Sequence, residues 1–183
     1  MYEDIKETVL SENEIQSKIK ELAAGINNDY KGGEIVVISI LKGALFFTSD
    51  LVRHLTLPVI MDYMAISSYG ALTKSSGVVR ILKDIEEDIE GKDCLIVEDI
   101  VDTGLSANYI KEILSLRNPK SLKICSLLDK KSKRVSPVNI EYAGFEVPEK
   151  FLVGYGLDFC GKYRHLRSIV TLKDEIVKTA VDK

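Results

Sequence analysis

The sequence lacks the features expected of a membrane-embedded, secreted or fibrous protein. No apolar stretch approaches the roughly 18 residues that cross a bilayer, and the acidic N-terminus MYEDIKETVL contains no apolar segment typical of a secretion signal. The three cysteines, Cys94, Cys125 and Cys160, form no CxxC motif, and this odd number favours reduced thiols over a disulfide framework. We therefore expect a cytoplasmic protein that has no membrane partner.

An excess of charge of one sign is also absent. The 183 residues include 25 Lys and Arg against 28 Asp and Glu, which leaves a formal net charge of −3. This balance argues against the basic surface that broad nucleic-acid binding requires, so we expect no nucleic-acid partner. At roughly 150 residues per domain, the length predicts a single domain over residues 1–183. Such a chain can bury a core without a disulfide or a structural metal.

The common nucleotide-binding and nucleophile motifs are missing as well. The chain contains no GxGxxG, no GxxxxGK followed by Ser or Thr, and no GxSxG, which disfavours a dinucleotide-binding fold and a P-loop. His54 and His165 lie far apart in sequence and lack the spacing of metal ligands, so we interpret both as structural or surface residues. Any chemistry must therefore depend on carboxylates, backbone amides and a few cations.

Short apolar runs alternate with helical patterns along the chain. Ser11 and Glu14 have the spacing of a capping box, and apolar residues recur at helical intervals over Glu12–Asn28. The continuous apolar run Ile35–Ile40 is typical of a strand buried on both faces. The other predicted elements are strands at Pro58–Ile66, Val78–Leu82, Cys94–Asp99, Leu122–Leu128, Ile140–Phe145 and Phe151–Tyr155, a turn at Ile100–Gly104, and helices at Gly43–Leu55 and Ser106–Leu116. Alternating strands and helices predict an α/β fold with a mostly parallel twisted sheet flanked by helices.

The most informative segment is CLIVEDIVDTGLS, which runs from Cys94 to Ser106. An apolar strand ends in two adjacent carboxylates, Glu98 and Asp99, and a third, Asp102, follows two apolar residues later. In open α/β sheets, ligands bind beyond the carboxyl ends of the strands. Because carboxylates accept hydrogen bonds from sugar hydroxyls and hold Mg²⁺, we expect this cluster to face a sugar or a metal ion.

The start of the following helix predicts an anion site. Free backbone N–H groups and two hydroxyl groups gather there, and a glycine lets the backbone approach a ligand closely. Phosphate suits such a site, so the segment as a whole predicts a phosphorylated sugar. We assign the 5′-phosphate to Asp102, Thr103, Gly104, Leu105 and Ser106. The structural alternative is that Asp102 and Thr103 only cap a helix after a solvent-facing acid cluster.

This segment, continued as VEDIVDTGLSA, resembles the phosphoribosyl-diphosphate (PRPP) motif of type I phosphoribosyltransferases. Four further segments, which span about residues 35–170 together with it, resemble the bacterial-type hypoxanthine(-guanine) phosphoribosyltransferases. The resemblance implies the type I fold, with a core at about 30–130 and a small hood formed by the chain-terminal segments at about 1–15 and 140–175. It also implies a purine-salvage enzyme that depends on Mg²⁺. Such an enzyme transfers 5-phosphoribosyl from PRPP to N9 of hypoxanthine, and of guanine, giving IMP or GMP and pyrophosphate.

Two of the matching segments are loops. Ile40–Ala44 resembles the pyrophosphate loop of the family, in which the peptide before the lysine is often cis, and this implies that Lys42 and Gly43 bind pyrophosphate. The segment SSYG resembles the mobile lid of the family, which implies that Ser68 and Tyr69 cover the site. A lid would keep water from a cationic sugar intermediate. The alternative for Ile40–Ala44 is an ordinary strand-to-helix turn, and the alternative for SSYG is a plain surface loop.

The two remaining segments imply a purine pocket. Lys130, in LLDKK, matches the lysine that contacts the exocyclic oxygen of a 6-oxopurine, and an ammonium group can only donate, which favours a keto oxygen over the amino group of adenine. Phe151 would stack on the base, and Leu152 would offer its backbone to the base edge. Asp158 would lie on the purine side, and Arg164 would bind pyrophosphate. Judged without the resemblance, Phe151 is a core residue and Arg164 a surface charge.

The resemblance further implies two Mg²⁺ ions and a general base. Glu98 and Asp99 would lie near the first ion and the ribose hydroxyls, and Asp158 would hold the second ion. Asp102 is the candidate general base, which would take the proton from N7 of the purine as positive charge develops on the sugar. The residues without an assigned function are Lys131 and Lys133, interpreted as solvated charges, and Cys160 and Lys162.

Two other functions remain possible at this point. The first is an RNA-binding regulator built on the same fold, such as the pyrimidine attenuation regulator, which would need a basic face that the scattered Lys and Arg residues do not suggest. The second is another enzyme of the superfamily that uses xanthine, adenine or uracil. The resemblance implies a homodimer or a homotetramer without deciding between them, and it leaves the preference between hypoxanthine and guanine open.

Overall fold

The computed structural model describes residues 2–68 and 79–181, and most of them surround one large sheet. Its strands are β2 (Ile35–Leu41), β3 (Val59–Ser68), β4 (Val79–Lys83), β5 (Asp93–Val101), β6 (Ser121–Asp129) and β7 (Tyr142–Glu146). The strand order is β4-β3-β2-β5-β6-β7. Neighbouring strands pair in parallel except β3 and β4, which are antiparallel. The predicted α/β fold with a mostly parallel sheet is confirmed.

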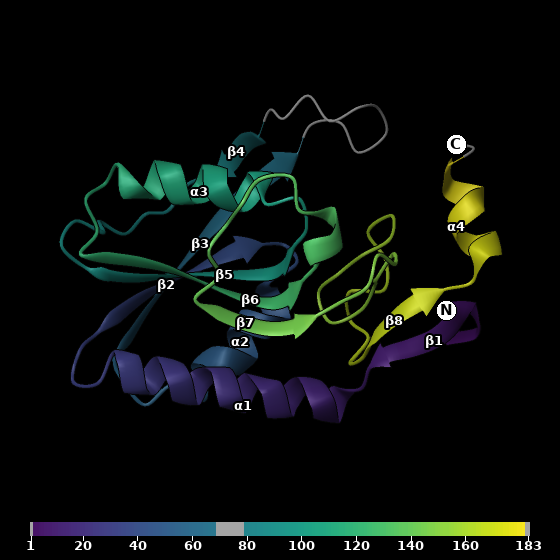
Figure 1. Cartoon of the computed structure of the whole chain (residues 1–183), viewed down its shortest axis with the longest axis horizontal. Coiled ribbons are helices and arrows are strands. Elements are labelled where there is room, and N and C mark those ends of the chain that lie inside the picture. The colour runs from purple at the N-terminus through teal and green to yellow at the C-terminus, as the bar shows by residue number, and fades with distance from the viewer. Residues whose placement is uncertain (1, 69–78, 182–183) are drawn as a thin grey trace.

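Helices cover both faces of this sheet (Figure 1). Helices α1 (Glu12–Asp29) and α2 (Leu45–Val52) lie on one face, and α3 (Leu105–Ser115) lies on the other. Helix α1 begins with the expected capping box, in which the Ser11 N–H donates to Glu14 Oε2 at 2.9 Å and the Glu14 N–H donates to Ser11 Oγ at 3.4 Å. Within residues 2–68 and 79–181, no helix is long and apolar enough to cross a membrane.

Strand β2 contributes to the core on both faces of the sheet. Ile35 and Val37 pack in the core that α1 and α2 cover, whereas Val36 and Ile38 pack in the core beneath α3. These four side chains are at most 1% exposed. Because every position of the strand faces a helical layer, the strand reads as an unbroken apolar run.

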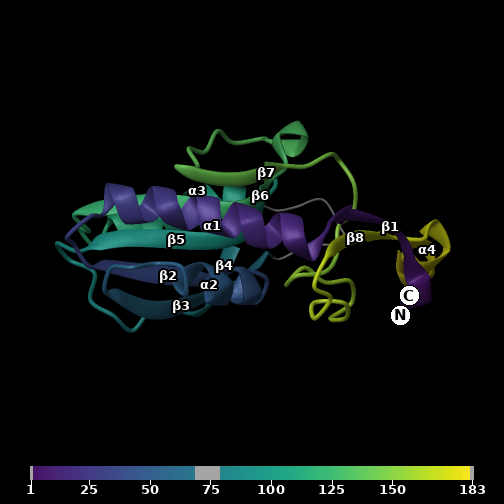
Figure 2. The same cartoon turned by 90° about the horizontal axis from the view of Figure 1, so that it is seen from below.

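A second, smaller unit joins the two ends of the chain. Strands β1 (Ile5–Leu10) and β8 (Ile169–Leu172) form an antiparallel two-stranded sheet, and helix α4 (Asp174–Val181) follows it. This unit lies beyond one end of the main sheet (Figure 1, Figure 2). Its small core contains Val153, Tyr163, Leu166, Val170 and Leu172. We call this unit, with the loop of residues 147–168 that leads into it, the hood.

The predicted strand at Phe151–Tyr155 is wrong. This stretch contributes two isolated bridges, between Val153 and Val170 and between Gly154 and Leu157. Gly154 and Tyr155 have φ angles of 97° and 49°, in the left-handed region, so an extended strand cannot continue through them. A strand was expected at Ile140–Phe145, and β7 lies there. It forms an edge strand of the main sheet, although residues from about 140 onward were expected to belong to the hood.

Several element boundaries also moved. Strand β5 continues through Val101, so the turn begins two residues later than the predicted Ile100–Gly104. Helix α2 is shorter than the predicted Gly43–Leu55, because residues 42–44 form a turn. Strands β1 and β8 and helix α4 were not predicted. The burial pattern of β1 mixes exposed and half-buried positions, which leaves no clear alternation to detect.

The cysteines behave as two core residues and one surface residue. Cys94 and Cys125 are fully buried in β5 and β6, and Cys160 is exposed. Burial raises the pKa of the Cys94 thiol to about 11 and that of Cys125 further still. Both therefore stay protonated and inert at neutral pH.

Candidate active site

The functional residues meet because three parallel strands end at the same edge of the sheet. Ser39 in β2 lies opposite Val97 in β5, and Ile100 in β5 lies opposite Leu128 in β6. The segments that follow these strands border one cavity of about 540 Å³. The predicted site residues that line it are Lys42, Gly43, Asp99, Asp102, Lys130, Phe151, Leu152, Asp158 and Arg164.

The other predicted residues that the structure describes lie outside this lining. Glu98 is buried at 7% exposure in β5, next in sequence to Asp99, which lines the cavity. Four residues of the expected phosphate site lie at the start of α3, and they are Thr103, Gly104, Leu105 and Ser106. Ser68 ends β3, whereas Tyr69 and most of the expected lid fall outside the described residues.

The structure adds residues that the sequence did not reveal. The additional lining residues are Ile100, Lys133, Glu149, Lys150 and Leu157. Lys133 is an exposed charge, as interpreted, but it also borders the cavity and pairs with Glu149 at 3.4 Å. Lys131 matches the interpretation, since it is exposed and pairs with Glu146 at 2.7 Å. No local pattern separates these neighbouring lysines, although the short 3-10 turn at Lys131–Lys133 turns them in different directions.

The turn after β2 is packed tightly between the acids and the hood. The Leu41–Lys42 peptide is cis. A Cβ on Gly43 would lie 1.7 Å from Asp99 Oδ2, and a Cβ on Gly156 would lie 1.9 Å from the Gly43 oxygen. Both positions therefore require glycine, because any side chain would displace the Asp99 carboxylate or the turn itself.

Arg164 and Asp158 form an anchored ion pair in the hood. Arg164 Nη2 lies 2.5 Å from Asp158 Oδ1, and Arg164 Nη1 donates to the Gly156 oxygen at 2.5 Å. Asp158 Oδ2 also accepts a hydrogen bond from the Gly161 N–H at 2.7 Å. These contacts hold one cation and one carboxylate at the cavity wall.

The two adjacent acids of β5 are held in an unfavourable environment for charge. Burial raises the pKa of Glu98 well above its ordinary value, and the neighbouring Asp99 charge raises it further. Burial also raises the pKa of Asp99 to about 6, although the Ile100 N–H and the Arg164 charge act in the opposite direction. Such acids gain from a bound cation or from donor hydroxyls, and perturbed acids of this kind are common at functional sites.

Asp102 has an acceptor atom without a partner. Its Oδ1 is buried and makes no hydrogen bond within residues 2–68 and 79–181. A buried, unpaired carboxylate oxygen is costly unless a ligand supplies the donor. Asp102 is therefore placed to accept a hydrogen bond or a proton from a molecule in the cavity.

A lysine and an aromatic ring mark another part of the cavity. Lys130 is 7% exposed, and its Nζ donates to the Lys150 oxygen at 3.1 Å. The Phe151 ring is half exposed and makes an edge-to-face contact with Phe159, at 5.5 Å between centroids. A face of the Phe151 ring thus remains available to stack on a planar ligand.

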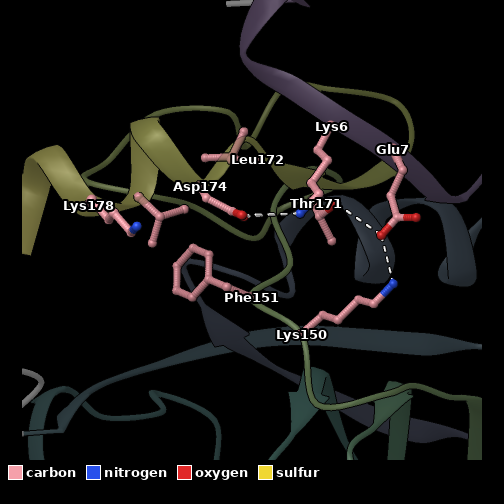
Figure 3. A pocket seen from close by; sticks show the side chains of 9 residues that line it. Lys6, Glu7, Lys150, Phe151, Thr171, Leu172, Asp174 and Lys178 are labelled. Atoms are coloured by element: carbon pink, nitrogen blue, oxygen red, sulfur yellow. Dashed lines mark hydrogen bonds and ion pairs between the residues drawn. The ribbon is translucent and has the colours of Figure 1, made fainter.

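A neighbouring cavity of about 570 Å³ in the hood shares Lys150 and Phe151 with the first (Figure 3). Four of its charged side chains form two pairs: Glu7 Oε1 lies 2.7 Å from Lys150 Nζ, and Lys6 pairs with Asp174 at 3.1 Å. The Glu7–Lys150 pair connects β1 to the segment that carries Phe151. The aromatic wall of the candidate site is therefore tied to β1 within the hood.

Comparisons with known proteins agree with this geometry. The family model described as the phosphoribosyl transferase domain matches residues 7–159. The hypoxanthine-guanine phosphoribosyltransferase of Bacillus subtilis is 45% identical over 179 residues, which cover 98% of this chain and 99% of that protein. The hypoxanthine phosphoribosyltransferase of Salmonella typhimurium is 47% identical over 173 residues, with coverages of 92% and 97%. A solved hypoxanthine phosphoribosyl transferase of Trypanosoma cruzi has a TM-score of 0.94 at 42% identity, covering 100% of this chain and 99% of that one.

The α/β fold, the acids at the end of β5 and the family match together define a phosphoribosyltransferase. The close relatives narrow this class, because their similarity extends over nearly the whole chain, hood included. The chain belongs to the hypoxanthine-guanine phosphoribosyltransferase family. The family resemblance inferred from the sequence is confirmed.

Replacing Gly43 with alanine tests the tight turn. Gly43→Ala places a Cβ 1.7 Å from Asp99 Oδ2, so the carboxylate or the turn must shift. Because a misplacement of about 1 Å can cost about 10²-fold in rate, we expect kcat/KM to fall by about that factor while the far-UV spectrum is retained. Gly25→Ala in α1 is the matched control, since its Cβ would lie 4.0 Å from the Tyr142 ring and should leave activity unchanged. Equal activities for both variants would contradict the steric argument.

The raised pKa of Asp99 predicts a pH-dependent stability difference. Its folded-state pKa of about 6 exceeds the ordinary 3.8, so the native state holds this proton more tightly than the unfolded chain does. This contribution to stability is complete below about pH 4 and is lost as the pH rises through about 6. Relative to wild type, Asp99→Asn should therefore gain on the order of 1–2 kcal/mol of unfolding free energy between pH 4 and 8, the lower end reflecting partial solvent access. Urea titrations in metal-free buffer measure it, and a difference independent of pH would contradict the prediction.

Proposed function

We propose that this chain is a purine-salvage enzyme that transfers the 5-phosphoribosyl group of PRPP to N9 of hypoxanthine or guanine. The products are IMP or GMP and pyrophosphate. One observation carries the proposal: a single cavity combines Lys130 and Phe151, which suit a 6-oxopurine, with Lys42, Asp99 and Arg164, which suit a pyrophosphorylated sugar. The names of the close relatives support the same reaction.

Each part of the substrate has a matching group. Phe151 stacks on the purine, and the Lys130 ammonium donates a hydrogen bond to its keto oxygen. Lys42 and Arg164 neutralise charge on the departing pyrophosphate. Asp102 accepts the N7 proton of the purine as the new bond to C1 of the ribose forms, which suits its buried and unpartnered Oδ1.

We further propose that Mg²⁺ binds together with PRPP. Carboxylate oxygens are suitable Mg²⁺ ligands, and Asp99 and Asp158 both line the cavity. Among the described residues, no three side chains of His, Cys, Asp or Glu form a metal-holding group on their own, so substrate oxygens and water would complete the coordination. When bound, Mg²⁺ neutralises and orients the pyrophosphate leaving group. Glu98 lies outside the lining, and its contact with metal or ribose stays a prediction.

The direct test is product formation with each candidate base in turn. The protein is incubated with PRPP, Mg²⁺ and hypoxanthine, guanine, xanthine, adenine or uracil, and nucleotides are separated by chromatography. We expect IMP and GMP to form, chelation of Mg²⁺ to stop the reaction, and adenine and uracil to give no product above the protein-free background. Failure with both hypoxanthine and guanine would refute the proposed function.

The assembly and location of the protein stay predictions. A homodimer or homotetramer is expected, and the Trypanosoma cruzi structure concerns the role of the C-terminal region in the oligomeric state and activity of that protein. Light scattering on the purified chain would distinguish a dimer from a tetramer. A cytoplasmic location is expected from the sequence.

Asp102→Asn tests the general base. The amide cannot accept the N7 proton, so kcat should fall by about 10²- to 10⁴-fold while PRPP still binds in a calorimetric titration. Asp88→Asn, on an exposed loop before β5, makes the same chemical change away from the cavity and should leave kcat unchanged. A near-normal kcat for Asp102→Asn would show that another group takes the proton.

Lys130→Gln tests recognition of the purine oxygen. Loss of the ammonium donor should raise KM for hypoxanthine by about tenfold or more, because a charged hydrogen bond is worth about 1.5–3 kcal/mol. KM for PRPP should change little. Lys131→Gln removes an adjacent surface lysine that is 62% exposed, and it should leave both constants unchanged. An unaltered purine KM in Lys130→Gln would remove Lys130 from the base-binding role.

A further inference from the structure

Arg134 connects the ends of β5 and β6 from a position outside the cavity lining. Its Nε donates to the backbone carbonyl oxygen of Asp102 at 3.1 Å, and its Nη2 donates to the backbone carbonyl oxygen of Val101 at 3.4 Å. The same Nη2 forms an ion pair with Asp129 Oδ1. The side chains of Arg134 and Asp129 are 17% and 8% exposed, so this contact is largely removed from water.

The strand ends that Arg134 joins carry residues proposed for both halves of the reaction. Asp129 directly precedes Lys130, and the Lys130 N–H donates to the Val101 oxygen at 2.9 Å. Asp102 follows Val101 and lines the cavity. The backbone that carries the purine-binding lysine and the backbone that carries the general base thus share Arg134 as a common partner.

The segment 134–136 also sets the orientation of residues 102–106, the expected 5′-phosphate site, which we call the phosphate loop. Carbonyl oxygens of three consecutive residues, 101–103, face this segment. Arg134 donates to the first two, and the N–H groups of the two residues after it donate to the third, at 2.9 and 3.0 Å. In a planar trans peptide the carbonyl and the next N–H point in opposite directions, so the N–H groups of 102–104 point away from the segment. Aligned N–H groups of this kind form a cradle for an anion.

Gly104 completes the fit between the loop and this segment. Its φ of 84° lies in the left-handed region, and a Cβ there would lie 2.3 Å from the Ser136 oxygen and 3.0 Å from Arg134 Cδ. The Asn108 side chain donates to Ser136 Oγ at 2.9 Å and so ties helix α3 to the same segment. Residues 102–104 of the loop are therefore packed against the segment 134–136.

We propose that Arg134 is a positioning residue for phosphoribosyl transfer, which orients the phosphate loop and aligns it with the purine-binding end of β6. The proposal rests on the function proposed above. Arg134 contacts no reacting atom in this arrangement. Its charge is matched by Asp129, and its Nε and Nη2 donate to backbone carbonyls at the end of β5 and in the turn that follows.

The planar guanidinium is essential to this role. It presents several donors in a rigid fork, so it can serve two carbonyl oxygens and one carboxylate at once. A lysine at this position would keep the charge but could not reproduce that geometry. Arg134→Lys therefore separates orientation of the loop from simple charge balance.

Steady-state kinetics and calorimetric PRPP binding of Arg134→Lys test the proposal. We expect KM and Kd for PRPP to rise at least tenfold and kcat to fall by a similar factor. The double variant Asp129→Asn with Arg134→Met removes both members of the buried pair, which avoids an unpaired charge. It should fold, as judged by far-UV spectrum and cooperative unfolding, and show the same PRPP defect. Arg117→Lys, at an arginine paired with Asp84 away from the site, is the control and should match wild type.

The outcomes separate this inference from the proposed function. If wild type formed no nucleotide from any oxopurine, the proposed function would fail regardless of Arg134. If wild type were active and Arg134→Lys kept KM and Kd for PRPP within twofold, the positioning role would be overturned. A loss of activity that scaled only with the unfolded fraction, with PRPP affinity unchanged in the folded protein, would overturn it as well.

Discussion

Parallel pairing of β2, β5 and β6 is the constraint on which the rest of the molecule depends. Three strands that run in the same direction end at one edge of the sheet, and the residues just beyond those ends must meet there. Lys42, Asp102 and Lys130 are brought together in this way, although they are far apart in sequence. Burial of the strands on both faces maintains the arrangement, since reversing any one of them would break the pairing and move its functional end to the opposite edge.

Electrostatics at this edge oppose folding and favour binding. Glu98 is buried and the adjacent Asp99 is half-buried in β5, and removal from water raises the pKa of both. The cations Lys42, Lys130 and Arg164 line the same cavity. A polyanionic substrate would neutralise these cations, and an accompanying metal ion would neutralise the acids. The near-neutral net charge of −3 therefore conceals a strongly charged site.

Close backbone packing fixes the positions of the segments that border the site, which charge interactions alone do not fix. The turn at Gly43 lies against Asp99 on one side and Gly156 of the hood on the other, and the phosphate loop lies against the segment at Arg134. Each of these contacts joins parts of the chain that belong to or follow different strands. The hood adds a further connection, because the Glu7–Lys150 pair links the N-terminal strand to the segment that carries Phe151.

The sequence by itself determined the α/β class, the strand-end acids and the family, because these features depend on short patterns that a single segment carries. Buried strands read as apolar runs, and the acid-rich turn before a helix reads as a motif. Only the tertiary structure decided the pairing of β1 with β8, the place of Lys133 in the cavity wall and the contacts of Arg134. These features depend on distances between segments from distant parts of the chain or on the direction of a short turn. A local pattern cannot specify either, because both are set by how the segments pack.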